Sequence, residues 1–335
     1  MKNITVFAVL VIILHSGQPV PVQGQQAYAV SVRPLFGLVS GHAEELVYPD
    51  GTTIAPLLSE LLWNMKPVFY YGVLLDFSQT RPIERWGFFS NISLKQGIPG
   101  VSGIHENRDW MSVVNTGLTD YSVHDNHTRE LFFFDFTAGL SFPLHRAVLL
   151  KTYINVSFIR FSFFGKDGHG MYAREIDPTP FRNSGQFHPI KENPDREQFQ
   201  GKVISYTQEW LYAAPGVAVS YYFFNNFFAE LSFMASPLIV SAALDEHKEH
   251  ALRPRGTQYR DYMQGGIMIE PGLQLFFAAG KQLAVSWDIS WRYISGTRGV
   301  TYQRSPIGSG TYLQGGEAGA GLSIITTGFG FNIRL

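Results

Sequence analysis

The sequence of 335 residues contains no cysteine, which excludes a disulfide framework, a thiolate nucleophile and a cysteine-ligated zinc or iron–sulfur centre. Charged residues are also scarce, at 16% of the chain, against about 25% in an average soluble protein. The 26 Lys and Arg nearly balance the 27 Asp and Glu, so the formal net charge is −1. A near-neutral chain lacks the positive surface that drives nucleic-acid binding, so we expect no nucleic-acid partner.

Long hydrophobic runs are missing as well. The N-terminal apolar stretch, residues 5–14, is too short to span a bilayer, which needs about 20 residues. It follows Lys2, and small residues at Val22 and Gly24 then form a cleavage-site pattern. This is the arrangement of a secretory signal peptide, predicted over residues 1–24, although a buried N-terminal helix is an alternative. No later stretch reaches 18 apolar residues, so we expect no membrane-spanning helix.

What the chain has in abundance is alternation with a period of two. Residues 130–142, 211–223 and 283–293 each place bulky apolar side chains on one face and small or polar side chains on the other. The 27 Phe, with Tyr and Trp, cluster towards the ends of such segments. This is the pattern of an outer-membrane strand, in which the bulky apolar side chains face the lipid and the small or polar side chains face the lumen. A closed β-barrel is also the only structure besides a helix that satisfies its backbone in lipid.

Ten such segments can be counted, and their connections alternate in length. The segments are residues 29–48, 60–78, 86–107, 128–142, 149–165, 202–223, 228–247, 258–278, 282–296 and 318–335. Four short connections alternate with five long ones, which are residues 49–56, 108–127, 165–200, 248–256 and 297–316. We therefore predict an all-β fold, a ten-stranded antiparallel transmembrane β-barrel of the bacterial outer-membrane type. Residues 25–335 would form its single domain, and the long loops would meet at the extracellular mouth.

Asp245 and His247 are the most informative pair at that mouth. Residues two apart on a strand share a face, so Asp245 can accept from one imidazole nitrogen and leave the other to take a proton from water. Asp109 is the obvious acid to hold the same water from across the barrel. The pair could instead be solvated surface, and a metal site of His124, His247 and His250 is a further alternative without tight ligand spacing.

One detail conflicts with an inward-facing pair. Leu231 and Phe233 are expected to face lipid, and Asp245 and His247 share their odd-numbered parity. An inward pair therefore requires a β-bulge or a change of twist between residues 238 and 245, or a strand end above the membrane, where either face is allowed.

Four segments together resemble the omptin family of ten-stranded outer-membrane endopeptidases. Residues 40–48 (SGHAEELVY) resemble the end of the family's first strand, and residues 105–111 (HENRDWM) its Asp-x-Asp-Trp-Met segment. Residues 119–124 (TDYSVH) resemble its Thr-Asp-x-Ser-x-His, and residues 245–247 (DEH) its catalytic Asp-Glu-His. The order, the spacing and the strand layout agree over nearly the whole mature chain.

The resemblance implies an enzyme that cleaves peptides at basic residues at the cell surface. His247 would activate a water, with Asp245 as its partner and Asp109 as the opposing acid. Glu45 would line the pocket for a basic P1 side chain and Asp120 the pocket for P1′, since a buried carboxylate selects Arg or Lys. Ser122 would have a supporting role. No metal or other cofactor is implied.

The chain departs from the family pattern at three places. Asn107 stands where the family has the first aspartate of its Asp-x-Asp pair, and Ala243 stands where it has a second acid of the P1 pocket. The family also binds lipopolysaccharide through its fifth strand. Arg160 matches one of those residues, but Val156 and Phe158 occupy neighbouring positions that are polar in the family. A lipopolysaccharide requirement is therefore not expected, although the barrel would still contact outer-membrane lipids.

Three functions follow from these observations. The first is an outer-membrane endopeptidase of the aspartic type. The second is a catalytically weak or inactive barrel that acts as a surface adhesin or receptor, for which Asn107 is the best argument. The third is a porin, which the sequence disfavours because side chains largely fill a lumen of ten strands.

Overall fold

The computed structural model describes residues 28–49, 54–79, 85–176, 186–192, 194–224, 226–247, 256–280, 283–304 and 312–334. The predicted signal peptide lies outside these ranges. No helix in the described part is long and apolar enough to cross a membrane. The strands are β1 (Tyr28–Tyr48), β2 (Ser59–Gln79), β3 (Gly87–Gly97), β4 (Gly100–Asp109), β5 (Asp120–His145), β6 (Val148–Tyr172), β7 (Asp195–Phe224), β8 (Phe227–Ser236), β9 (Ile239–His247), β10 (Thr257–Gln264), β11 (Ile267–Ala278), β12 (Leu283–Arg304) and β13 (Leu313–Arg334).

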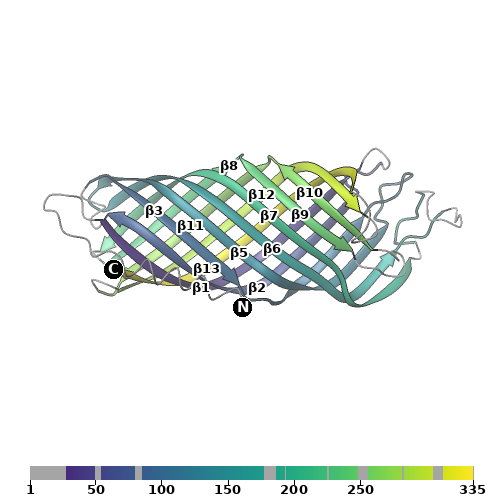
Figure 1. Cartoon of the computed structure of the whole chain (residues 1–335), viewed down its shortest axis with the longest axis horizontal. Coiled ribbons are helices and arrows are strands. Elements are labelled where there is room, and N and C mark those ends of the chain that lie inside the picture. The colour runs from purple at the N-terminus through teal and green to yellow at the C-terminus, as the bar shows by residue number, and fades with distance from the viewer. Residues whose placement is uncertain are drawn as a thin grey trace.

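These strands form one closed antiparallel barrel (Figure 1). The sheet closes because β1 pairs with β2 on one side and with β13 on the other. Three consecutive pairs of strands, β3 with β4, β8 with β9 and β10 with β11, each continue one line of the barrel after a short break, since both members lie between the same neighbouring lines. The barrel therefore has the ten strand lines that the sequence predicted.

Side chains alternate between the outside and the interior of the barrel. On β13, Phe329, Phe331 and Ile333 are about half exposed, whereas Leu322 and Ile324 nearer the mouth are buried. On β7, Leu211 and Val217 point outwards and Ala214 and Ala218 lie inside. An apolar outer belt and small interior side chains are the arrangement expected of strands that face lipid.

Five strands extend further towards the mouth than the alternation predicted. β5 begins at Asp120 and not at residue 128, β6 ends at Tyr172 and not at 165, and β7 begins at Asp195 and not at 202. Likewise, β12 ends at Arg304 and β13 begins at Leu313. These predicted boundaries were wrong because apolar and polar residues alternate only where one face of the strand meets lipid. Above the apolar belt polar residues occur on both faces of a strand, while the backbone ladder continues, as between β6 and β7 up to Tyr172 and Asp195.

An aromatic layer fills the barrel below the mouth. Trp63, Phe163 and Tyr206 are fully buried, and the Trp63 ring stacks on the other two at centroid distances of 5.7 and 5.4 Å. Trp210, also fully buried, donates from its indole nitrogen to Gln208, whose amide reaches the backbone oxygen of Glu44 across the barrel. This layer closes the interior of the barrel below the mouth, which argues against a conducting pore.

A separate polar cavity of about 800 Å³ lies in the other half of the barrel. Buried ion pairs bridge its walls, since Arg292 contacts Glu270 at 2.5 Å and Asp135 at 3.3 Å, and Lys151 contacts Glu230 at 2.7 Å. None of the residues of the predicted site lines this cavity.

Candidate active site

An offset between β8 and β9 turns the predicted Asp–His pair inwards. Leu231 and Phe233 are exposed on β8, but on β9 the exposed residue is Val240, whereas Ala243 and Asp245 are buried. The parity changes at residues 236–238, where the backbone NH of Leu238 bonds the Ser236 hydroxyl instead of a strand neighbour. The expected offset is present, but the predicted place between residues 238 and 245 was wrong. Pro237 explains this position, because proline has no NH for the ladder.

Asp245 and His247 form a close pair at the mouth. Oδ2 of Asp245 lies 2.5 Å from Nε2 of His247, and the two side chains are 2% and 17% exposed. Nδ1 of His247 has no hydrogen bond within the described residues. The imidazole is therefore held by its buried carboxylate and presents its second nitrogen at a partly open position, the arrangement of an oriented base.

Asp109 lies at the end of β4, where its carboxyl group accepts hydrogen bonds from Ser59 and Asn107. The Ser59 hydroxyl donates to its Oδ1 at 2.5 Å, and the Asn107 amide donates to its Oδ2 at 3.1 Å. Hydrogen bonds to the ionised form favour it over the protonated form. Asn107 thus acts here as a donor to Asp109, a contact that an aspartate at this position could make only if protonated.

Glu45 is buried near the aspartates, with 3% of its surface exposed. Its pKa lies well above the usual range because burial disfavours the carboxylate and because the negative charges of Asp245, Asp261 and Asp109 add to that effect. The structure therefore places Glu45, Asp109 and Asp245 close enough for their charges to interact. Asp120 lies beside them, in register with Asp109 across the β4–β5 pair, and is half-buried.

Asp261 on β10 completes this acidic group, and no motif in the sequence points to it. Its side chain is 2% exposed, and burial with the charge of Asp245 raises its pKa to about 7. Ser59 was also missed. Both residues lie outside the four segments that resemble the omptins, and only the strand register shows what they face.

Two further histidines lie close to His247 in the same interior. Ser122, predicted to have a supporting role, contacts Nε2 of His124 at 3.2 Å. His105 is 1% exposed, lies between Trp63 and His124 at centroid distances of 3.9 and 5.5 Å, and has no hydrogen bond at either nitrogen. Burial lowers the pKa of His105 well below its usual value.

The metal alternative finds no support in the described part of the chain. No group of three or more His, Asp or Glu side chains there is arranged to hold a metal ion. His250, a member of the considered set, lies outside the described residues.

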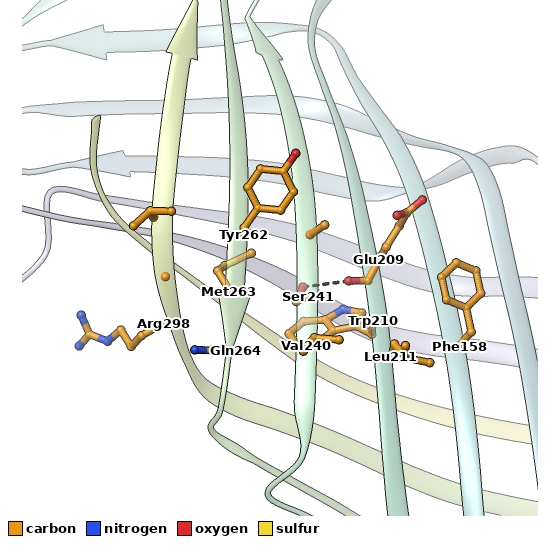
Figure 2. Close-up of a pocket in the computed structure, with 13 residues that line it drawn as sticks. Phe158, Glu209, Trp210, Leu211, Val240, Ser241, Tyr262, Met263, Gln264 and Arg298 are labelled. Atoms are coloured by element: carbon orange, nitrogen blue, oxygen red, sulfur yellow. Dashed lines mark hydrogen bonds between the residues drawn. The ribbon is translucent and has the colours of Figure 1, made fainter. Parts of the chain in front are cut away.

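Arg160 lies on the outside of the barrel, away from the mouth site. It contacts Glu130 at 3.2 Å and Glu209 at 2.8 Å, so two carboxylates surround one guanidinium. Glu209 also lines a shallow outer groove with Leu211, Val240 and Tyr262 (Figure 2). This groove contains none of the residues predicted for catalysis or substrate binding.

Comparisons with known proteins place this geometry in context. Residues 26–335 match the sequence model of the Omptin family. No curated protein sequence matches the chain. Among solved structures, the outer membrane protease OmpT from Escherichia coli is similar with a TM-score of 0.77, at 18% identity over 94% of this chain and 100% of that chain.

Other solved barrels are much less similar. The translocator domain of the autotransporter NalP from Neisseria meningitidis has a TM-score of 0.34 at 10% identity, covering 100% of this chain and 95% of its own. The toluene transporter TodX from P. putida has a TM-score of 0.29 at 8% identity, covering 92% of this chain and 90% of its own. Neither similarity informs the function.

Proposed function

The chain belongs to the omptin family of bacterial outer-membrane proteases, and from this premise we propose that it hydrolyses peptide bonds beside basic residues at the cell surface. The observation on which the proposal rests is the buried contact of 2.5 Å between Asp245 and His247 at the mouth of the barrel. It gives a histidine base whose orientation is fixed and whose second nitrogen is available.

In this proposal the water is the nucleophile. Nδ1 of His247 removes a proton from the water as its oxygen attacks the carbonyl carbon of the scissile bond. The resulting imidazolium is stabilised by Asp245 through Nε2. When the C–N bond breaks, the same nitrogen returns the proton to the leaving amine, so no covalent enzyme intermediate is required.

Asp109 is the opposing acid that positions the water. Hydrogen bonds from Ser59 and Asn107 favour its ionised form, which would accept a hydrogen bond from the water and balance the imidazolium charge. One carboxylate with an amide neighbour therefore takes the part for which the family pattern has two carboxylates.

Substrate selection is assigned to the neighbouring acids. Glu45 would bind a basic P1 side chain, because a buried carboxylate without a cation gains most from a charged partner. Asp120 would face the P1′ side chain from the start of β5.

Lipopolysaccharide is not required in this proposal. The carboxylates of Glu130 and Glu209 more than neutralise Arg160, so this part of the outer face does not attract a lipid phosphate.

A peptide pool tests the proposal. The folded barrel would be incubated with a randomised peptide library, with and without lipopolysaccharide, and products would be sequenced by mass spectrometry. We expect cuts next to Arg or Lys that do not depend on the lipid. If the barrel binds peptides but cuts none of them, hydrolysis would be contradicted. That result would favour the adhesin or receptor alternative, for which Asn107 is the supporting observation. Conductance of the barrel in a planar bilayer would identify a porin.

A further inference from the structure

Asp261 lies directly opposite Ala243 on the neighbouring strand. The register of β9 and β10 pairs Asp261 with Ala243, and two residues further it pairs Tyr259 with Asp245. Ala243, Asp245 and Asp261 are all buried on the interior side, at 5%, 1% and 2% exposure. The carboxylate at this level therefore comes from β10, and β9 contributes only the methyl group of Ala243.

Neither Glu45 nor Asp261 forms an ion pair with a basic side chain in the described part of the chain. The groups that act electrostatically on Glu45 are Asp245, Asp261 and Asp109, and the one that acts on Asp261 is Asp245. Asp245 is committed to His247 through Oδ2, and Thr301 from β12 bonds Asp261.

Oε2 of Glu45 and Oδ1 of Asp261 are buried without a hydrogen bond, and so is Oδ1 of Asp245. Burying a carboxylate oxygen without a partner is costly, so an interior that keeps such oxygens is complementary to a ligand that brings donors and positive charge. A guanidinium supplies five N–H donors in a planar fork and can bond two carboxylates at once.

We propose that Asp261 is a specificity-determining residue, which together with Glu45 binds the guanidinium or ammonium group of a basic P1 side chain. The inference depends on the proposed peptidase function for its substrate, whereas the position of Asp261 opposite Ala243 comes from strand register and burial. It places the second pocket acid on β10, across from Ala243, so that the loss of an acid at position 243 is compensated from the adjacent strand.

Direct binding tests this assignment without requiring cleavage. The His247→Ala barrel would be titrated with two fluorescent peptides that differ only at one central residue, arginine in one and its neutral isostere citrulline in the other. We expect tighter binding of the arginine peptide. Asp261→Asn in the same background should reduce the ratio of the two affinities by about 10- to 100-fold, the effect of a lost charge-assisted hydrogen bond, and leave citrulline binding unchanged.

Two variants control this experiment. Asp288→Asn removes a carboxylate that lines the separate polar cavity in the other half of the barrel. It should leave the ratio of the arginine and citrulline affinities unchanged. Ala243→Asp combined with Asp261→Asn moves the carboxylate back across the strand pair and should restore the ratio. Folding of each variant would be checked by heat-dependent migration in gels.

The outcomes separate this inference from the proposed function. An unchanged ratio in a folded Asp261→Asn barrel would overturn the assignment, and so would a parent barrel with no preference for arginine over citrulline. If binding prefers arginine through Asp261 but the unmutated barrel cuts no peptide, the assignment of Asp261 would stand and the proposed peptidase function would be refuted.

Discussion

Asp245 holds His247 through Nε2, at 2.5 Å, and is almost completely shielded from solvent. Asp245→Asn keeps the shape of this contact but removes the charge that stabilises an imidazolium. We predict a fall in kcat of about 10³- to 10⁴-fold, the range for a carboxylate that orients a histidine base, with little change in KM. Steady-state kinetics on an Arg-Arg peptide would measure it, and a loss below tenfold would show that the carboxylate is dispensable.

Asn107 and Asp109 give a second prediction at the residue scale. Asn107→Asp replaces a donor at 3.1 Å from Asp109 by a second carboxylate. Two carboxylates at this distance share a proton, so the pKa of one of them rises. The acidic limb of the pH dependence of kcat/KM should therefore move to higher pH, by about one unit.

Asn107→Ala is the control for this shift, because it removes the donor without adding a charge. A pH profile that is the same in Asn107→Asp and in the parent barrel would mean that Asp109 does not have to be ionised for the reaction.

The site residues divide clearly into those that the sequence could predict and those that it could not. Asp245, His247, Asp109 and Glu45 lie in short segments with distinctive neighbours, and the structure brings them together. Asp261 has no such segment, since only its register against β9 places it opposite Ala243. Register is set by backbone pairing over whole strands and cannot be obtained from local sequence.

At the scale of elements, the offset at residues 236–238 decides which face of β9 lines the mouth. Deleting both Pro237 and Leu238 would remove the offset and join Ile239 directly to Ser236. Because neighbouring side chains on a strand point to opposite faces, Ile239 and every second residue after it would then turn to the outer face, Asp245 and His247 included. We predict a folded barrel in which His247 points outwards and cleavage falls to the level of His247→Ala. Peptide cleavage and heat-dependent migration would be measured together.

A compensating change provides the control for the deletion. Inserting one residue at the same place in the deletion variant restores the parity and should restore cleavage. A deletion variant that stays active would show that the pair reaches the mouth without the offset.

The ten strand lines were predictable and the strand ends were not. Alternation of the kind seen along β7 and β13 arises where one face meets lipid and the other the lumen, and that is where the predicted segments agree with the structure. The extensions of β5, β6 and β7 lie above this belt. The outer face no longer meets lipid there, so the side chains of the two faces do not have to differ in polarity. The parity problem of β9 was detectable in the sequence, but its position was not.

At the scale of the whole molecule, buried titratable groups at the mouth make stability depend on pH. Asp261 has a folded pKa of about 7 against an ordinary value of 3.8, and the pKa of Glu45 is raised as well. The folded state therefore binds more protons than the unfolded state in this range, so the contribution of these groups to stability is lost as pH rises from about 4 to about 7.

His105 acts in the opposite direction. Its pKa is lowered in the folded state, so the unfolded state binds the extra proton and stability falls as pH drops below about 6.5.

Asp261→Asn separates these two effects. We predict that it stabilises the unliganded barrel at pH 8 relative to pH 5, by on the order of 2–4 kcal/mol, as measured by urea unfolding in lipid vesicles. Equal effects at the two pH values would contradict the assigned protonation of the mouth.

The central claim is that Asp245 and His247 activate a water for peptide hydrolysis. The most direct test is kcat/KM of the refolded barrel, residues 25–335, on a quenched fluorescent peptide with a central Arg-Arg, beside the His247→Ala barrel. The account predicts cleavage between or next to the two arginines by the first protein and loss of at least a thousandfold in the second. Equal rates in the two folded proteins, or no cleavage by either, would contradict it.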